Sequence, residues 1–232
     1  MDKYAVIVAG GAGTRMGSSL PKQFLSLRGR SILWYTLSAF LEAYHNIQII
    51  LVLPEFYLEK GQSIANSMPR SENIILTRGG STRFESVKNG LAHVPDDALV
   101  FVHDGVRCLV TPRLIKRCYD AAIEKGNAIP AVSPVDTVRI ETPKGNEMMD
   151  RVQVKLIQTP QTFFAGILKK AFRQPYRDSF TDEASVLESF GENIHLVEGE
   201  ITNLKITTQL DLLVADKILE KRDEFPEKCE NL

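Results

Sequence analysis

Short apolar segments alternate with longer amphipathic segments along most of the chain. The apolar segments are rich in Val, Ile and Leu, as in strands buried on both faces of a sheet, and strands are expected at 4–8, 47–53, 74–77, 99–103, 128–132, 155–158 and 194–197. Apolar positions with helical spacing lie between them, at 32–42, 58–67, 83–94, 112–125, 166–173 and 182–190. This alternation predicts a Rossmann-like α/β fold with a mostly parallel, twisted sheet and helices on both faces.

The chain is long enough for one large core and shows no repeat, low-complexity tract or long linker. Of its 232 residues 44% are hydrophobic, and we expect a single domain over 1–232. Residues 136–154 depart from the pattern, because they begin like an exposed strand and contain the turn signal Pro143-Lys144-Gly145-Asn146, which predicts a protruding hairpin. Residues 222–232 are charged and poor in apolar side chains, and we expect this tail to fray.

A glycine-rich segment follows the first predicted strand. Gly10, Gly11 and Gly13 allow the backbone to turn sharply and to point its N–H groups at an anion. Arg15 and Lys22 then supply full positive charges, which could neutralise the charge that develops when a bond between two phosphates breaks. The segment therefore predicts a triphosphate site, and an ordinary glycine-rich turn is the alternative for the glycines alone.

Two better-known glycine-rich signatures do not fit this segment. A Walker A loop requires a Gly-Lys-Ser/Thr ending, which is absent, and the dinucleotide pattern G-x-G-x-x-G requires Gly or Ala where Met16 stands. The acidic residue that would hold a ribose about 20 positions later is also not convincingly placed. A dehydrogenase is therefore a weak alternative.

Polar residues also follow two later strands, at the sheet edge where parallel α/β folds bind ligands. Gly79-Gly80 precedes a helix that Thr82 and Glu85 would cap, so this loop would present free N–H groups. Asp104 follows a strongly apolar strand and could hold a ribose hydroxyl or Mg²⁺, which takes one or two carboxylates together with substrate phosphates. A cap on the next turn is the alternative role for Asp104, and His103, which has no partner for a triad, is expected to be structural.

The glycine-rich segment A-G-G-x-G-T-R-M-G, followed by P-K-Q-F, resembles the N-terminal signature of sugar-phosphate and alditol-phosphate nucleotidyltransferases. Within this group the chain resembles the 2-C-methyl-D-erythritol 4-phosphate cytidylyltransferase family. Five ordered blocks carry the resemblance: Pro21-Lys22-Gln23-Phe24, Phe101-Val102-His103-Asp104, Gln158-Thr159-Pro160-Gln161, Thr181-Asp182-Glu183-Ala184 and Asn203-Leu204-Lys205-Ile206-Thr207. It extends from about Tyr4 to Leu219, and the matching intervals between the blocks argue against a chance match.

The resemblance implies roles for residues in and near these blocks. It implies catalytic roles for Arg15, Lys22, Arg151 and Lys205, and nucleotide binding by Ala9, Gly10, Gly11, Gly13, Gly80, Ser81, Ser86 and Asp104. It implies acceptor binding by Arg107, Thr137, Arg151, Thr181 and Lys205, and a Mg²⁺ cofactor with Asp104 as the metal ligand.

Several of these residues have simpler interpretations when the resemblance is set aside. Arg151 would then be one of many surface arginines, and Lys205, on a strand expected at 203–208, would protect a sheet edge. Two positions also depart from the family pattern, which often has an acid where Ser81 stands and a proline where Cys108 stands.

The resemblance also implies an assembly and a reaction. The hairpin at 136–154 would clasp the second subunit of a homodimer and carry Thr137 and Arg151 across the interface. The reaction would transfer CMP from CTP to 2-C-methyl-D-erythritol 4-phosphate, releasing pyrophosphate, in the non-mevalonate synthesis of isoprenoid precursors. Ribitol-5-phosphate cytidylyltransferase, which makes CDP-ribitol, is the closest alternative, and a non-catalytic nucleotide-binding subunit is a more distant one.

Composition limits the partners and the location. The formal net charge of −1 argues against a general binder of nucleic acid or of a membrane surface. Cys108, Cys118 and Cys229 form no close-spaced pair, so neither a disulfide framework nor a cysteine-based zinc site is expected. The sequence has no run of 18 apolar residues and no signal-peptide pattern, so we expect a cytoplasmic protein.

Overall fold

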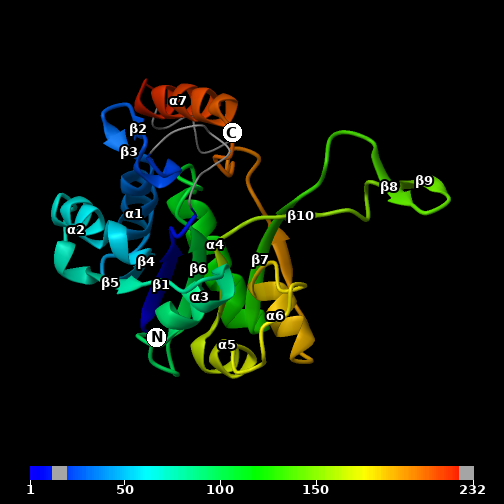
Figure 1. The fold of residues 1–232 in the computed structure, drawn as a ribbon, viewed down its shortest axis with the longest axis horizontal. Coiled ribbons are helices and arrows are strands. Elements are labelled where there is room, and N and C mark those ends of the chain that lie inside the picture. The colour runs from blue at the N-terminus through cyan, green and yellow to red at the C-terminus, as the bar shows by residue number, and fades with distance from the viewer. Residues whose placement is uncertain (12–19, 225–232) are drawn as a thin grey trace.

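The computed structural model describes residues 1–11 and 20–224, and a mostly parallel sheet lies at its centre (Figure 1). The strand order is β10 (Leu156–Ile157), β7 (Asn127–Val132), β11 (Gln161–Phe164), β6 (Leu99–Asp104), β1 (Lys3–Val8), β4 (Gln48–Leu53) and β5 (Ile74–Arg78), and β12 (Leu196–Glu198) also pairs with β7. Strands β5, β4, β1 and β6 pair in parallel, as does β12 with β7, whereas β10 and β11 are antiparallel to their neighbours. The predicted fold class is confirmed.

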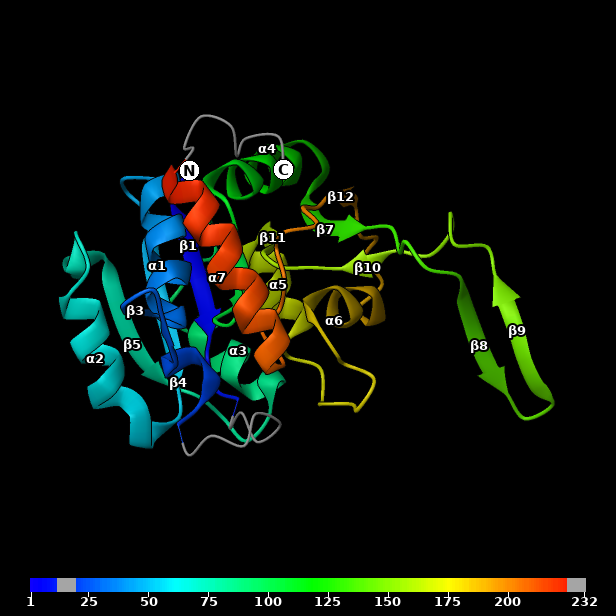
Figure 2. The ribbon, with the colours of Figure 1, turned by 90° about the horizontal axis from the view of Figure 1, so that it is seen from above.

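Helices cover both faces of the sheet (Figures 1 and 2). One layer contains α1 (Ile32–Ala43), α2 (Leu58–Asn66) and α4 (Pro112–Lys125), and the other contains α3 (Arg83–Leu91), α5 (Ala165–Ala171) and α6 (Glu183–Ser189). In β1, Ala5 and Ile7 pack into the core of the first layer, while Val6 packs into that of the second. Successive strand side chains point to opposite faces, so a continuously apolar strand requires cover on both.

The antiparallel strand β11 is absent from the sequence prediction. It lies between β6 and β7, with Thr162 opposite both Phe101 and Ala128. Its four residues, Gln161–Phe164, are too few to show a periodicity, and they begin with two polar side chains. Pairing partners supplied by the rest of the sheet therefore determine this strand.

The segment 203–207, which includes Lys205, was predicted to be part of a strand, and this prediction is wrong. The Ile206 N–H donates to the Val106 carbonyl at 3.0 Å. The Thr207 N–H instead donates to the Asp211 carboxylate at 2.8 Å. The polar backbone groups of the segment are thus satisfied by a loop and by the cap of the following helix, rather than by a neighbouring strand.

A long helix, α7 (Gln209–Glu224), follows this segment. Its Ala215 and Leu219 share a third core cluster with Ile206. The helix includes the first three residues of the tail expected to fray, and Arg222 Nη2 donates to the Leu109 carbonyl at 2.8 Å. Residues 225–232, with Cys229, lie outside the described residues. Within the described chain, no helix has the length and apolar character needed to cross a membrane.

A two-stranded hairpin extends away from the body of the molecule in both views (Figures 1 and 2). It consists of β8 (Val138–Thr142) and β9 (Gly145–Met149), which pair only with each other. This is the hairpin predicted within 136–154, with its turn at Pro143-Lys144. Smaller elements are the hairpin of β2 (Ser26–Leu27) and β3 (Arg30–Ser31) and the 3-10 turns η2 (Lys22–Phe24), η3 (Glu55–Tyr57) and η4 (Ser71–Asn73).

Candidate active site

A cleft of about 470 Å³ lies at the carboxyl ends of the parallel strands. Loops that follow β1, β5 and β6 form its walls, together with the segment before α7. This is the position at which open α/β sheets bind ligands. Nine of the site residues suggested by the sequence line it: Ala9, Gly10, Gly11, Lys22, Gly80, Ser81, Ser86, Asp104 and Lys205. Gly13 and Arg15 lie outside the described residues.

The first wall is the glycine-rich segment after β1. The Ala9 N–H donates to the Val52 carbonyl at 3.0 Å, which continues the sheet pairing by one residue. The buried amide of Gln23 donates to the Ala9 carbonyl at 2.6 Å. Lys22 begins the short η2 turn, and its Nζ donates to the Thr207 carbonyl at 3.1 Å. The ammonium group of Lys22 is therefore held at the cleft by the segment on its opposite side.

The second wall is the loop before α3. Thr82 caps the helix, as predicted, by accepting the Glu85 N–H at 3.1 Å. Ser86 Oγ accepts the Gly80 N–H at 3.1 Å and donates to the Thr82 carbonyl at 2.9 Å. A Cβ at position 80 would lie 2.3 Å from that of Glu85, so only glycine fits without a shift. The loop thus folds tightly against the first turn of its own helix.

Ser81, at the rim of this loop, is bound by the same helix. Its N–H and its hydroxyl both donate to Glu85 Oε2, at 2.7 and 2.6 Å. These hydrogen bonds hold the pKa of the Glu85 carboxyl below its usual value. At the position where the family often has an acid, this chain therefore has a serine whose hydroxyl is hydrogen-bonded to the Glu85 carboxylate.

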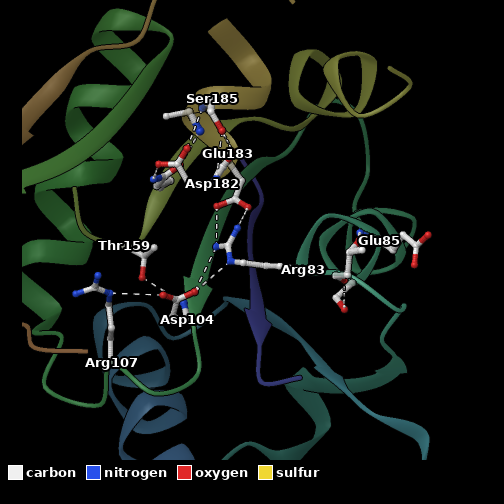
Figure 3. A network of polar contacts seen from close by, with 12 residues as sticks. Arg83, Glu85, Asp104, Arg107, Thr159, Asp182, Glu183 and Ser185 are labelled. Atoms are coloured by element: carbon white, nitrogen blue, oxygen red, sulfur yellow. Dashed lines mark hydrogen bonds and ion pairs between the residues drawn. The ribbon is translucent and has the colours of Figure 1, made fainter. Parts of the chain in front are cut away.

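Asp104, the last residue of β6, lies among three cations, of which Figure 3 shows Arg83 and Arg107. Its Oδ1 accepts from Nε and Nη2 of Arg83, both at 3.3 Å. Its Oδ2 lies 2.8 Å from Lys205 Nζ and 3.7 Å from Arg107 Nε. Burial alone would raise the pKa of the Asp104 carboxyl, but Arg83, Lys205 and Arg107 together hold it well below the usual range. Asp104 is therefore ionised at neutral pH.

Arg83 and Glu183 are two residues to which sequence reasoning assigned no role. Arg83 begins α3 and Glu183 begins α6, and the guanidinium bonds both carboxylate oxygens of Glu183 at 2.5 and 3.0 Å. Burial raises the pKa of the Glu183 carboxyl, and the Arg83 charge opposes this rise. Their positions in the sequence could have indicated a role, because Arg83 directly follows the Gly79–Thr82 loop and Glu183 lies within the Thr181–Ala184 block.

His103 braces the loop that carries Asp104 and Arg107. Its Nε2 lies 3.2 Å from the Arg107 carbonyl, which can only accept, so Nε2 carries the proton. Its Nδ1 lies 2.9 Å from Thr159 Oγ1 and accepts the hydroxyl proton, while the same oxygen accepts the Asp104 N–H at 3.2 Å. The imidazole is fully buried, and burial lowers the pKa of His103 to about 3. His103 is thus a neutral, structural residue, as predicted.

This neutral imidazole predicts a loss of stability in acid. The unfolded pKa is 6.5 and the folded pKa is about 3, so the unfolded chain binds more protons between these values and the free energy of unfolding falls as the pH drops below 6.5. Between pH 7 and pH 5 we expect the wild type to lose about 2 kcal/mol more than His103→Gln, which cannot titrate there. Guanidinium denaturation at both pH values measures the difference, and equal losses would contradict the assignment.

The remaining residues suggested for the acceptor lie at different places. Arg107 is beside Asp104, and its Nη1 donates to the Asn203 carbonyl at 2.9 Å. Thr137, Arg151 and Thr181 are exposed and do not line the cleft of their own chain. Arg151 lies at the base of the hairpin, where its Nη1 donates to the Val135 carbonyl at 2.9 Å. Within one chain, the described candidate nucleotide-binding residues therefore lie together in the cleft, whereas Thr137, Arg151 and Thr181 lie outside it.

A mostly parallel sheet with two glycine-containing loops and a cluster of cations at its carboxyl edge is the arrangement of a nucleotide-binding α/β protein. A sequence model of the 2-C-methyl-D-erythritol 4-phosphate cytidylyltransferases matches residues 4–221, and the chain belongs to this family. The members of this family are nucleotidyltransferase enzymes, so the dehydrogenase and the non-catalytic subunit are disfavoured as alternatives. The family match also favours 2-C-methyl-D-erythritol 4-phosphate over ribitol 5-phosphate as the acceptor.

Named relatives and solved structures agree with this family assignment. The 2-C-methyl-D-erythritol 4-phosphate cytidylyltransferase of Bacteroides thetaiotaomicron is 46% identical over 94% of this chain and all of its own length. That of Porphyromonas gingivalis is 45% identical over 94% of this chain and 97% of its own. The crystal structure of 4-diphosphocytidyl-2C-methyl-D-erythritol synthase from Anaerococcus prevotii superposes with a TM-score of 0.82 at 28% identity, covering 94% of this chain and 96% of that one. The Francisella tularensis enzyme gives 0.77 at 34% identity, covering 94% and 99%.

Proposed function

We propose that this protein transfers the CMP group of CTP to 2-C-methyl-D-erythritol 4-phosphate, releasing pyrophosphate and forming 4-diphosphocytidyl-2-C-methyl-D-erythritol. The observation that carries the proposal is the cleft itself, in which Lys22 and the glycine loops lie opposite Asp104 and Lys205. The names of the relatives supply the acceptor. The reaction would belong to non-mevalonate isoprenoid precursor synthesis in the cytoplasm, where these charged substrates are dissolved.

The chemistry requires positioning and charge neutralisation more than acid–base catalysis. A phosphate oxygen of the acceptor attacks the α-phosphorus of CTP in line, and pyrophosphate leaves. A phosphate monoester has a second pKa of about 6, so the nucleophile is already largely ionised at neutral pH. Lys22 and Arg15 neutralise the charge that develops on the transferred and leaving oxygens, and backbone N–H groups of Gly10, Gly11 and Gly13 add to this. Lys205 orients the acceptor phosphate.

The nucleoside end of CTP would lie against the loop before α3. Gly80, Ser81 and Ser86 line that part of the cleft, and Ala9 lies at the end of β1 facing it. The Ser86 hydroxyl holds the Gly80 N–H and the Thr82 carbonyl, which keeps the loop in one shape before CTP arrives. Selectivity for the base would therefore depend on a loop, before α3, that already has its binding conformation in the absence of CTP.

Mg²⁺ fits this site as an ion held chiefly by the substrate. Among the described residues no group of three or more His, Cys, Asp or Glu side chains could hold a metal by itself. Asp104 is the carboxylate that lines the cleft, and Mg²⁺ commonly takes one or two carboxylates with substrate phosphates. When bound, the ion would neutralise phosphate charge. Asp104 would hold the ion while it keeps its contact with Lys205, because a carboxylate oxygen can accept more than one contact.

The acceptor site would be completed by a second copy of the chain. The hairpin that carries Thr137 and Arg151 at its base makes no strand pairing with the main sheet, and Val135 and Val152 beside it are 80% and 72% exposed. A homodimer in which each hairpin reaches the partner would cover these apolar side chains. Thr137 and Arg151 would then bind the acceptor phosphate in the partner's cleft, facing Arg107, Thr181 and Lys205.

Pyrophosphate release tests this function. With CTP and Mg²⁺ we expect release when 2-C-methyl-D-erythritol 4-phosphate is supplied and little release with D-ribitol 5-phosphate under identical conditions. A metal chelator should abolish release, and added Mg²⁺ should restore it. Release with ribitol 5-phosphate alone would overturn the acceptor, and full activity in the chelator would overturn the metal requirement.

A further inference from the structure

Four alternating charges connect the start of α6 with the rim of the cleft, and Figure 3 shows the first three of them. They are, in order, Glu183, Arg83, Asp104 and Lys205. The links are the paired contacts of Arg83 with Glu183 at 2.5 and 3.0 Å, the two contacts of Arg83 with Asp104 Oδ1 at 3.3 Å, and the 2.8 Å contact of Asp104 Oδ2 with Lys205. Lys205 is thus connected to a carboxylate on a distant helix.

Glu183 lies behind the cleft. Its side chain is 1% exposed, and it is not among the residues that line the cleft, whereas Arg83 and Asp104 are. Gln161 fixes the start of the helix on both sides of Glu183, because its side chain donates to Asp182 Oδ2 and accepts the Ala184 N–H, each at 2.8 Å. Glu183 is therefore a rigid anchor that has no contact with substrate.

Arg83 contacts only one of the two carboxylate oxygens of Asp104. Its Nε and Nη2 take Oδ1, and its other contacts go to Glu183, so Oδ2 is left for Lys205 and Arg107. The planar guanidinium can serve two carboxylates at once, which an ammonium group cannot do in the same geometry. Without the Glu183 charge, Asp104 would be the remaining carboxylate partner of Arg83 and would be drawn away from Lys205.

We infer that Glu183 is a positioning residue for the acceptor phosphate: by holding Arg83 it turns Asp104 Oδ2 toward Lys205 and so sets the place of the Lys205 ammonium group. This inference rests on the proposed function, in which Lys205 binds that phosphate. It predicts an effect on one substrate, because Lys22 and the glycine loops on the CTP side have contacts that do not pass through Glu183.

Steady-state kinetics of Glu183→Gln test the inference. We expect the KM for 2-C-methyl-D-erythritol 4-phosphate to rise about tenfold, since a charged hydrogen-bond partner is lost, and the KM for CTP to change by less than about threefold. Glu188→Gln is the matched control, because it removes the same charge from an exposed position on the same helix, and it should match the wild type. A folded Glu183→Gln with an unchanged acceptor KM, or with equal increases in both KM values, overturns the inference.

If Glu183→Gln folds poorly, Arg83→Gln alone decides the question, because it breaks the same link and should also raise the acceptor KM about tenfold; an unchanged acceptor KM in folded Arg83→Gln overturns the inference. Where Glu183→Gln folds, the double variant gives a second comparison. Because Glu183 acts through Arg83, adding Glu183→Gln to Arg83→Gln should raise the acceptor KM by less than about twofold further. A further tenfold rise would show an independent role and overturn the inference. Wild-type protein in the same assay separates the two proposals: absence of release overturns the proposed function and this inference with it, whereas wild-type release with an unaffected Glu183→Gln overturns the inference alone.

Discussion

We expect Lys22→Ala to lower kcat/KM by about a hundredfold, or about 3 kcal/mol of transition-state stabilisation, by analogy with the removal of single oxyanion donors. The reason is the place of its ammonium group, which lines the cleft beside the glycine-rich segment and is held there by the Thr207 carbonyl. This charge acts most strongly on oxygens that become more negative during the reaction. The loss should therefore appear mainly in kcat, and pyrophosphate release at saturating CTP measures it.

The control for Lys22→Ala is Lys116→Ala, which removes an exposed lysine from α4, away from the cleft. It should keep wild-type activity. Because Lys22 also bonds the segment before α7, thermal unfolding must show that Lys22→Ala remains folded. Near wild-type turnover in a folded Lys22→Ala protein would remove Lys22 from the catalytic group.

We expect heterodimers of Lys22→Ala and Arg151→Ala subunits to recover about half of wild-type activity, although each variant alone should be nearly inactive. This follows if Arg151 serves the partner's cleft. One of the two sites then combines an intact cleft with an intact hairpin, and the other lacks both residues. Purification through two different affinity tags isolates the heterodimer, and pyrophosphate release measures its activity.

The reciprocal pairing is the control for this experiment. A heterodimer of wild-type and doubly substituted Lys22→Ala/Arg151→Ala subunits contains the same residues, but each site now lacks one of them, so it should be nearly inactive. If Arg151 served the cleft of its own chain, the two results would be exchanged. A monomer in solution would overturn the shared site directly.

Most of the core strands and helices could be predicted from the sequence because their signals are local, although α7 was not among the predicted helices. The apolar run before Asp104 and the capped helix after Thr82 each depend on residues within a few positions. The antiparallel β11 could not be predicted, because its four residues carry too little periodicity and its pairing partners are distant. Lys205 was wrongly placed on a strand, because its apolar neighbours Leu204 and Ile206 pack against α7 rather than in the sheet.

The positions of some candidate site residues could likewise be predicted from the sequence, and those of others could not. The glycine loops, Lys22 and Asp104 follow predicted strands, and the carboxyl ends of parallel strands meet at one edge, so their convergence in the cleft could be foreseen. The positions of Thr137 and Arg151 could not, because the hairpin extends away from the body of the molecule and pairs with no strand of the main sheet, so the local sequence pattern does not indicate which cleft it would serve.

By itself the sequence determined the family, most of the core strands and helices and the edge of the sheet at which the candidate site lies, because each of these depends on local pattern or on blocks of adjacent residues. Only the tertiary structure decided which charges meet. Arg83 and Glu183 are 100 residues apart in the chain, and Arg83 and Asp104 are 21 apart. Ion pairs of this kind have no periodicity in the sequence and form only when helix packing brings side chains from distant segments to the same strand end.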